Sequence, residues 1–307
     1  MSGFYASHLT LIQQTAVVAV LAMSFQVVLR SGVFSFASAG FYVVGAYAAA
    51  DMSKAGWPLL PALIAIVITG AACGYLLSIP FVRLRGLYLG MVTFAFAEIL
   101  VVVADNGGSV TGGPVGLFGV TLEVSTAELF LIVAVVALLI SQLERRGLGR
   151  ALRVISIDEQ LARTMGIDIN RQRAFIFALS SALGALAGAL NTVTTSSVAP
   201  TGFGYNLIVL GLTMAVFGGV GSWTGAIIGA IIVTWFPEVF GFVGNYRSVV
   251  YGILLILVVV FEPSGVLGLI DRLTALIRQV RRPAPPGGQA GVPVAAREIS
   301  AKHGAPI

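Results

Sequence analysis

The chain has 307 residues, of which 57% are hydrophobic and only 10% are charged. A soluble domain of this size has about a quarter of its residues charged, so the composition excludes a water-soluble protein. Because the apolar runs reach about 20 residues, they suit membrane-spanning helices and are too long for the strands of a barrel, and the sequence predicts an all-α integral membrane protein.

Nine membrane segments, within a range of 8 to 10, are expected in chain order. They cover residues 9–29, 33–50, 58–82, 86–104, 127–143, 174–195, 206–221, 223–243 and 249–262. The second and seventh are short and glycine-rich, which suits a re-entrant or tilted segment. We therefore expect a polytopic helical bundle, a permease domain over residues 1–282. A disordered cytoplasmic tail should follow over 283–307, where the composition offers too little apolar surface to bury.

The distribution of basic residues predicts the orientation. If the N-terminus is outside and the segments alternate, every Lys and Arg except Lys54 and Arg247 lies on the inner side. The long loop 105–126 would lie outside, and it carries Asp105 and Glu123 but no basic residue. The positive-inside rule then puts the N-terminus outside and the C-terminus in the cytoplasm. The net charge of +5 is explained by this asymmetry and not by nucleic acid binding.

Small residues at four-residue spacing predict close contacts between helices, since glycines let two backbones approach in lipid. The pairs are Gly70 with Gly74, Gly86 with Gly90, Gly184 with Gly188, and Gly225 with Gly229. In a chain with 37 glycines such pairs also arise by chance. They favour a compact bundle and specify nothing finer.

The outer stretch 86–117 holds one candidate site. Glu98 lies within an apolar helix, about 10 Å from the outer end at 1.5 Å per residue. An intramembrane carboxylate is costly and should face the bundle interior or water, where it would serve either a pathway or a hydrogen bond between helices. The glycines and the proline that follow break the helix. The candidate translocation pathway consists of Glu98, Thr111, Gly112, Gly113 and Pro114.

The segment 144–173 is the only sizeable polar stretch between membrane segments. Apolar and polar residues from Ala151 to Ala162 fall near helical spacing, which predicts one short helix, and Gly166 is a plausible end for it. Two interpretations remain open at this point. The segment is either a docking element for a cytoplasmic partner or a solvated loop whose arginines set the topology.

Several kinds of chemistry have no support in the sequence. Cys73 is the single cysteine, and the two histidines, His8 and His303, lie near opposite termini, so we expect no disulfide and no metal site. The lysines, Lys54 and Lys302, do not fit the Gly-Lys-Ser/Thr pattern of a phosphate-binding loop. We therefore expect neither an enzyme nor a nucleotide cofactor in this chain.

Four stretches, in order, resemble the permeases of branched-chain amino acid ABC transporters, and specifically the LivM branch. They are RGLYLGMVTFAFAEI with SVTGGPVGL (85–117), RALRVISIDEQLARTMGIDINRQRAFIFALSSALGALAGAL (150–190), FGGVGSWTGAIIGA (217–230) and YGILLILVVVFEPSGVLGL (251–269). The resemblance implies import of branched-chain or other small amino acids across the inner membrane of a bacterium. It also implies a second related permease, two cytoplasmic ATPases that bind ATP-Mg, and an extracytoplasmic binding protein.

The resemblance further implies which residues receive the work of ATP hydrolysis. The stretch that would seat in the ATPase groove contains Asp158, Glu159, Ala162, Met165, Gly166 and Ile167. One position departs from the family, which commonly has asparagine where this chain has Val115. Related permeases for urea, short amides, aromatic acids or sugars therefore remain alternatives, and so does an ion-driven secondary transporter.

Overall fold

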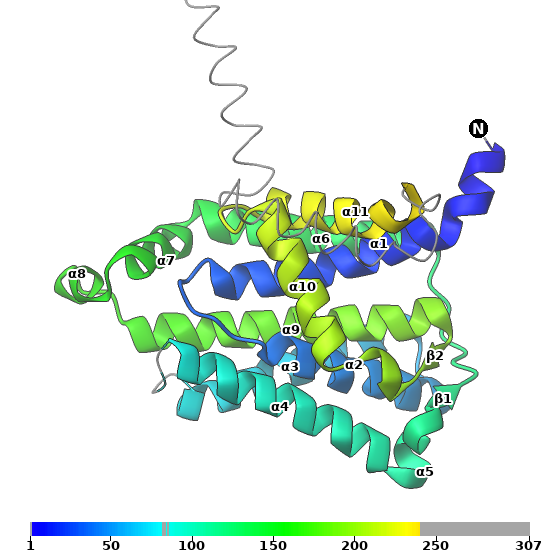
Figure 1. The fold of residues 1–307 in the computed structure, drawn as a ribbon. Coiled ribbons are helices and arrows are strands. Elements are labelled where there is room, and N and C mark those ends of the chain that lie inside the picture. Colours follow the sequence, from blue (N-terminus) through cyan, green and yellow to red (C-terminus); the bar gives the residue numbers. More distant parts are fainter. Residues whose placement is uncertain (1, 82–83, 85, 240–307) are drawn as a thin grey trace, which may run out of the picture. The chain divides into compact units, whose positions relative to one another are not determined.

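A computed structural model describes residues 2–81, 84 and 86–239, and most of them are helical (Figure 1). All of these residues belong to one compact unit, Met1–Leu269. The elements in chain order are α1 (Ser2–Leu29), α2 (Ala37–Lys54), α3 (Leu59–Phe81), α4 (Leu87–Asn106), α5 (Gly108–Thr111), the 3-10 helix η1 (Gly113–Val115), β1 (Leu117–Phe118), α6 (Thr126–Arg145), α7 (Gly147–Ile157), α8 (Glu159–Thr164), α9 (Ile169–Thr195), β2 (Ser197–Val198), the 3-10 helix η2 (Pro200–Gly202), α10 (Tyr205–Gly218) and α11 (Trp223–Val239).

The helices confirm a polytopic membrane protein. Six segments within the described residues are long and apolar enough to cross a membrane: His8–Leu29, Leu59–Phe81, Leu87–Asn106, Thr126–Arg145, Ile169–Thr195 and Pro200–Gly218. The expected segments at 33–50 and 223–243 correspond to α2 and α11, which are helical but are not among these six. The expected segment 249–262 and the predicted tail lie outside the described residues, so the total of nine stays a prediction.

Helix α9 is the centre of the described bundle, where α1, α2 and α3 pack against it (Figure 1). The contact between α2 and α9 is backbone to backbone. A Cβ on Gly45 would overlap the carbonyl of Ala185, and a Cβ on Gly188 would overlap the carbonyl of Tyr42. This close approach requires glycine, which explains why the interior of α9 is built from small residues.

Three of the four predicted glycine pairs lie at such contacts. Gly70 and Gly74 bring α3 against α9, Gly184 and Gly188 bring α9 against α2, and Gly225 and Gly229 bring α11 against α10. The fourth pair does not serve a close helix contact. Gly86 has open space around it and a φ of +57° just before α4, and Gly90 is in ordinary van der Waals contact.

Burial separates inner helices from outer ones. We compare the most apolar stretch of 18 residues in each helix. In α1 and α9, 72% of this stretch is buried, but only 33% is buried in α3 and α6 and 28% in α4. The exposed positions on these outer helices are mostly large aliphatic residues. Such faces suit a hydrocarbon environment, because in water they would be a large exposed apolar area.

Helix α2 begins well inside the bundle. The chain from Arg30 to Phe36 is not helical, and the carbonyl of Ser38 lies next to Gly184, about 22 Å along α9 from its first residue. The Phe36 N–H donates to the hydroxyl of Thr93 on α4, with 3.0 Å between nitrogen and oxygen. The second segment is thus an 18-residue helix that begins partway along the bundle, and a re-entrant or tilted course in the membrane stays a prediction.

The two ends of the bundle differ in composition. We call one the arginine-rich end, formed by the last turns of α1 and α6, by α7 and α8, and by the first turns of α9 (left in Figure 1). All eight described arginines lie there: Arg30, Arg145, Arg146, Arg150, Arg153, Arg163, Arg171 and Arg173. We call the other the glycine-rich end, formed by α5, η1, β1, β2 and η2. There Leu117 and Phe118 pair antiparallel with Val198 and Ser197.

Candidate functional site

The predicted single helix at the arginine-rich end is two helices, so this expectation was wrong. Asp158 has extended backbone, with φ −152° and ψ 114°, and separates α7 from α8. Its carboxylate accepts from the backbone N–H groups of Gln160 at 2.7 Å and Leu161 at 3.2 Å. An aspartate in this position caps the start of a helix, because it satisfies N–H groups that have no partner within the first turn. The spacing from Ala151 to Ala162 thus spans two elements.

The predicted helix end at Gly166 is confirmed. Gly166 has a φ of +78° and follows the last residue of α8, Thr164, and its cap, Met165. The N–H of the next residue, Ile167, donates to the carbonyl of Ala162 at 3.0 Å and closes the turn. A left-handed glycine at this position is the usual way to end a helix.

A small hydrophobic cluster joins α7, α8 and α9. Ile155, Ala162 and Ile169 are its buried members, and Val154 and Ile167 pack against it. Ala162 has no exposed surface at all. Of the six predicted coupling residues, Ala162 therefore lies in this cluster and not on the surface, and Ile167 is partly buried beside it.

An ion pair links α8 to the central helix. The carboxylate of Glu159, the first residue of α8, pairs with the guanidinium of Arg173 on α9. The Arg173 side chain is only 10% exposed and that of Glu159 is 33% exposed. Glu159 thus reaches inward to the bundle, so α8 is tied to α9 by a charged pair as well as by apolar packing.

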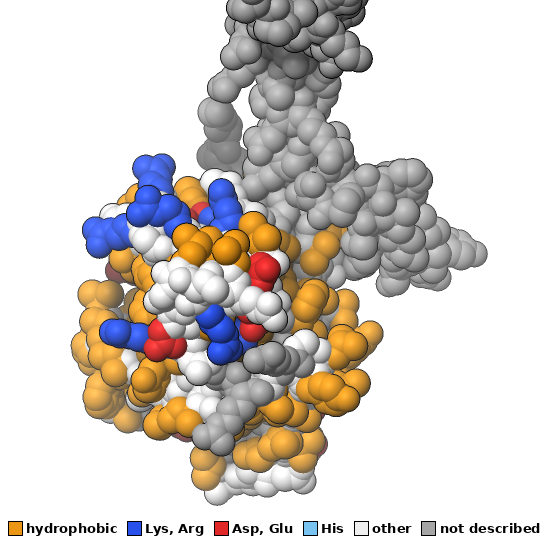
Figure 2. All heavy atoms as spheres, turned by 90° about the vertical axis from the view of Figure 1, so that its left-hand side faces the viewer, with side chains coloured by type: hydrophobic (Ala, Val, Ile, Leu, Met, Phe, Trp, Pro, Cys, Tyr) orange, Lys and Arg blue, Asp and Glu red, His pale blue; other side chains and the backbone are white. Residues whose placement is uncertain are grey.

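Three large apolar side chains are exposed on α7, on α8 and at the cap of α8. Ile157 is 78% exposed, Leu161 51% and Met165 63%. Figure 2 shows the arginine-rich end face on, with apolar side chains among cationic and acidic ones. An exposed apolar group with a charged surround marks a surface for a protein partner. Only Met165 was among the predicted residues. The spacing of four residues between the three positions is the signal that could have identified Ile157 and Leu161.

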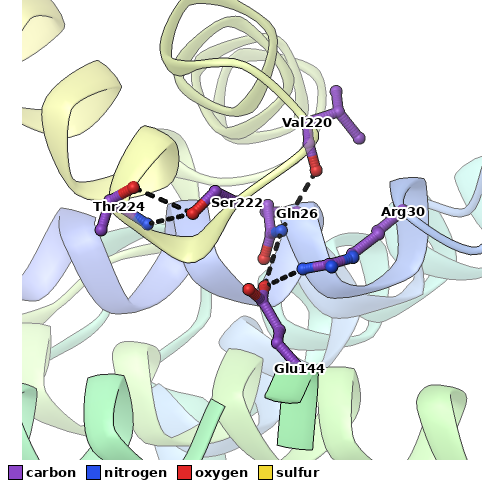
Figure 3. A network of polar contacts seen from close by, with 6 residues as sticks. All are labelled: Gln26, Arg30, Glu144, Val220, Ser222 and Thr224. Carbon is purple, nitrogen blue, oxygen red and sulfur yellow. Dashed lines mark hydrogen bonds and ion pairs between the residues drawn. The ribbon is translucent and has the colours of Figure 1, made fainter. Parts of the chain in front are cut away.

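A polar network lies beneath this surface and joins three elements (Figure 3). The side-chain amide of Gln26 on α1 donates to Glu144 on α6 at 3.3 Å and to the carbonyl of Val220 at 3.1 Å, and Arg30 forms an ion pair with Glu144. Val220 lies in the turn between α10 and α11. Sequence reasoning missed this network, although a glutamine within an apolar run, as at position 26, was a visible signal.

At the other candidate site, Glu98 lies against the start of α10. A Cβ on Gly204, the residue that precedes α10, would lie 3.0 Å from Glu98 Oε1 and 3.1 Å from Oε2. Oε1 is buried and has no hydrogen-bond partner within the described residues. A helix N-terminus favours a negative charge, since its first N–H groups point outward. The carboxylate therefore faces the bundle and not lipid, as expected.

The turn from Thr111 to Pro114 packs against the last turn of α4, about 10 Å along that helix from Glu98. Gly113 is buried below the last turn of α4, near the carbonyl of Asp105, and Thr111 and Gly112 are half-buried. Gly112 and Gly113 have φ values of +76° and +59°, which confirms an irregular, glycine-dependent turn. Val115, the position that departs from the family, is 70% exposed. The structure thus divides the predicted pathway residues between two places along α4.

The described residues contain no group of three or more His, Cys, Asp or Glu side chains with the geometry to hold a metal ion. Cys73, on α3, is exposed and has a free thiol.

Comparison with known proteins agrees with this architecture. Residues 7–259 match the family described as branched-chain amino acid transport system / permease component. The chain is 30% identical over 292 residues to the high-affinity branched-chain amino acid transport system permease protein LivM of Salmonella typhimurium, which covers 82% of this chain and 68% of that protein. It is 28% identical, with the same coverage, to LivM of Escherichia coli.

A sugar permease is also similar. The ribose import permease protein RbsC of Escherichia coli is 27% identical over 271 residues, which cover 82% of this chain and 84% of that protein. No solved structure matches the chain. With its apolar helices, its lipid-suited outer faces and a family match over most of its length, the chain belongs to the permease components of branched-chain amino acid transport systems and is a multi-pass protein of the inner membrane.

Proposed function

We propose that this permease moves branched-chain amino acids, or small solutes of similar chemistry, into the cytoplasm. The energy would come from ATP-Mg bound by two separate cytoplasmic ATPase subunits, with a second related permease and an extracytoplasmic binding protein completing the transporter. The family match and the names of the LivM relatives support this proposal.

The observation that carries the proposal is the construction of the arginine-rich end. It presents the exposed side chains of Ile157, Leu161 and Met165 on α7 and α8, and Glu159 ties α8 to the central helix through Arg173. A partner that binds this surface and changes shape would displace α8 and α9 together. A rigid docked helix transmits displacement, whereas a solvated loop absorbs it.

The assignment of this end to the cytoplasm rests on the arginines. A cysteine at Ser109, on α5, should react with an impermeant reagent added to intact cells, whereas one at Gln160 should not. Cys73 is removed first, because it is exposed on α3. The reverse labelling pattern would overturn the orientation and the docking surface with it.

Import of ribose-type sugars is the second candidate, and the similarity to RbsC favours it. The ion-driven alternative would need coupled carboxylates at membrane depth, and Glu98 is the one clear candidate that the sequence offers. The three mechanisms differ in the solute carried and in the source of energy, so a single transport assay can separate them.

The experiment is uptake into proteoliposomes that contain the transporter purified together with its partner subunits. We expect uptake of labelled leucine that requires the binding protein and ATP, and that stops with a non-hydrolysable ATP analogue. Uptake of ribose instead of leucine would select the second candidate. Uptake driven by an ion gradient without ATP would contradict the proposal.

The docking surface has its own test. Leu161→Asp should release the ATPase subunits during purification, because it places a charge in the middle of the apolar contact. Gln160→Asp is the matched control, since it adds the same charge to an exposed position of the same helix that is already polar. If both variants retain the ATPases equally, the surface of α8 is not the docking surface.

A further inference from the structure

One exposed face of α6 continues directly into a row of arginines. Leu131, Val135 and Leu138 are 65%, 46% and 61% exposed, and Gln142 and Arg145 follow them on the same side of the helix at spacings of three or four residues. Arg145 lies about 10 Å beyond Leu138 along the helix axis. This distance carries the chain from the hydrocarbon region to the depth of the headgroups.

The apolar part of this face suits lipid better than another helix. Its exposed residues, which also include Phe130 and Leu139, are large, whereas contacts between membrane helices use small residues. The contacts inside this bundle follow the second pattern, as the glycines between α2 and α9 show. The face of α6 thus has the chemistry of a lipid-facing surface.

Among the described residues, the arginines beyond this face have no partner of opposite charge. Arg145, Arg146, Arg150 and Arg153 are exposed, and none of them forms an ion pair with any residue that the structure describes. The neighbouring Glu144 does not neutralise them, because Arg30 and Gln26 already occupy it. Along α7, Arg150 and Arg153 share one side of the helix, and Arg146 precedes its first residue.

Their location points to the membrane surface. Figure 2 shows cationic side chains gathered at the rim of the arginine-rich end, next to apolar side chains that continue along the outside. Ile157 lies four residues beyond Arg153 on the same side of α7, and Leu161 and Met165 follow it in and just after α8. The arginines are therefore placed where α6 leaves the hydrocarbon.

We propose that Arg145, Arg146, Arg150 and Arg153 form a binding surface for anionic phospholipid headgroups. Guanidinium groups donate two parallel hydrogen bonds to phosphate oxygens, and an anionic leaflet attracts clustered Lys and Arg beside a membrane helix. The lipid tails would lie along the apolar face of α6. Bound lipid would fix the position of α7, and through the cluster around Ala162 the position of α8.

The test uses the transporter as purified with its partner subunits and reconstituted in phosphatidylcholine vesicles that contain 30% phosphatidylglycerol. Spin-labelled phosphatidylglycerol and spin-labelled phosphatidylcholine are compared for association with the protein by electron paramagnetic resonance. Attraction of about 1 kcal/mol per basic residue corresponds to about fivefold per charge. We expect the preference for phosphatidylglycerol over phosphatidylcholine to be at least about threefold lower in the double variant R146Q/R150Q than in the unmodified protein.

The matched control is K54Q/R163Q, which removes the same number of charges at positions away from the α6 face. It should keep the preference of the unmodified protein, and 0.5 M salt should weaken the preference only where the arginines remain. The proposal would be overturned if the unmodified protein, R146Q/R150Q and K54Q/R163Q had the same preference for phosphatidylglycerol. Loss of a partner subunit from R146Q/R150Q with lipid preference unchanged would also overturn it, because the arginines would then face an acidic protein.

Discussion

The two ends of the bundle are held together by different kinds of contact. At the arginine-rich end, side chains hold the elements together: Glu159 pairs with Arg173, Glu144 with Arg30, and Gln26 reaches the turn before α11. At the glycine-rich end the backbone does this, through the pairing of β1 with β2 and through turns with positive φ values at Gly112, Gly113 and Gly116.

This difference determines which substitutions each end tolerates. An end held by ion pairs responds to changes of charge. An end held by closely packed backbone accepts changes of charge on its surface but has no room for a Cβ where two backbone segments touch, as at Gly116. The four predictions below separate these two behaviours, beginning with the largest expected effect.

Gly116→Ala should be the most damaging change at the glycine-rich end. Gly116 has a φ of +82°, and a Cβ there would overlap the carbonyl of Val198, which pairs with Leu117. We expect a loss of about 3 kcal/mol or more in unfolding free energy, from backbone strain and from displacement of β2. Thermal unfolding of the detergent-solubilised protein, followed by size-exclusion chromatography, measures it.

Gly119→Ala is the control, because Gly119 also has a positive φ, +77°, but has no atom within reach of a Cβ. The backbone strain alone should cost about 1 kcal/mol. If the two variants lose the same stability, the contact between Gly116 and Val198 does not hold this end together.

Reversal of charge should be the most damaging change at the other end. Glu159→Arg would place two guanidinium groups together beside α9, and Arg173→Glu would place two carboxylates together. Each should cost about 2 kcal/mol, the range for a hydrogen bond to a charged group. The double reversal should restore most of the stability and of the solute imported per ATP hydrolysed. Failure of the double variant to recover import would indicate that Glu159 acts on a partner subunit and not on Arg173.

Gly166→Val should have an intermediate effect that depends only on backbone conformation. Gly166 has a φ of +78°, and a Cβ at this position would meet no atom within 4 Å, so the cost is that of a left-handed β-branched residue, about 1–2 kcal/mol. The end of α8 should shift, with loss of bound ATPase subunits. Gly166→Asn should be milder, because asparagine tolerates this conformation. Equal effects of the two substitutions on unfolding temperature would contradict this reason.

Glu98→Gln should change stability least. The amide keeps the shape of the side chain and removes only a charge next to the start of α10, which is worth about 0.3–1 kcal/mol. If Glu98 serves the pathway, uptake should fall by a larger factor while the complex still assembles. Unchanged uptake, or failure to assemble, would assign Glu98 to a hydrogen bond between helices.

Local features of the fold could be predicted from the sequence. The apolar runs located the helices, Gly166 ended α8 as expected, and the pairs Gly70 with Gly74 and Gly184 with Gly188 lie at helix contacts. The break at Asp158 was missed for a physical reason. Ile155 and Ala162 both pack near Ile169, so residues of two helices produce the periodicity of one.

Contacts between distant parts of the chain could not be predicted. Nothing near Glu98 in the sequence indicates that Gly204 lies beside it, and nothing near Glu144 indicates Gln26. The burial of individual residues could not be predicted either. Ala162 and Met165 both belonged to the predicted coupling stretch, yet Ala162 has no exposed surface and Met165 is 63% exposed. Such properties depend on which helices become neighbours, and a single sequence without the fold does not contain that information in readable form.

The glycine contact between α2 and α9 has a practical consequence for spectroscopy. Because the two backbones touch at Gly45 and Gly188, neither helix can rotate or slide against the other without a steric clash. Probes on these two helices should therefore keep a constant separation throughout the transport cycle. The distance between probes on α2 and α9 can therefore serve as a fixed reference for distance changes measured on α4, α6 or α10.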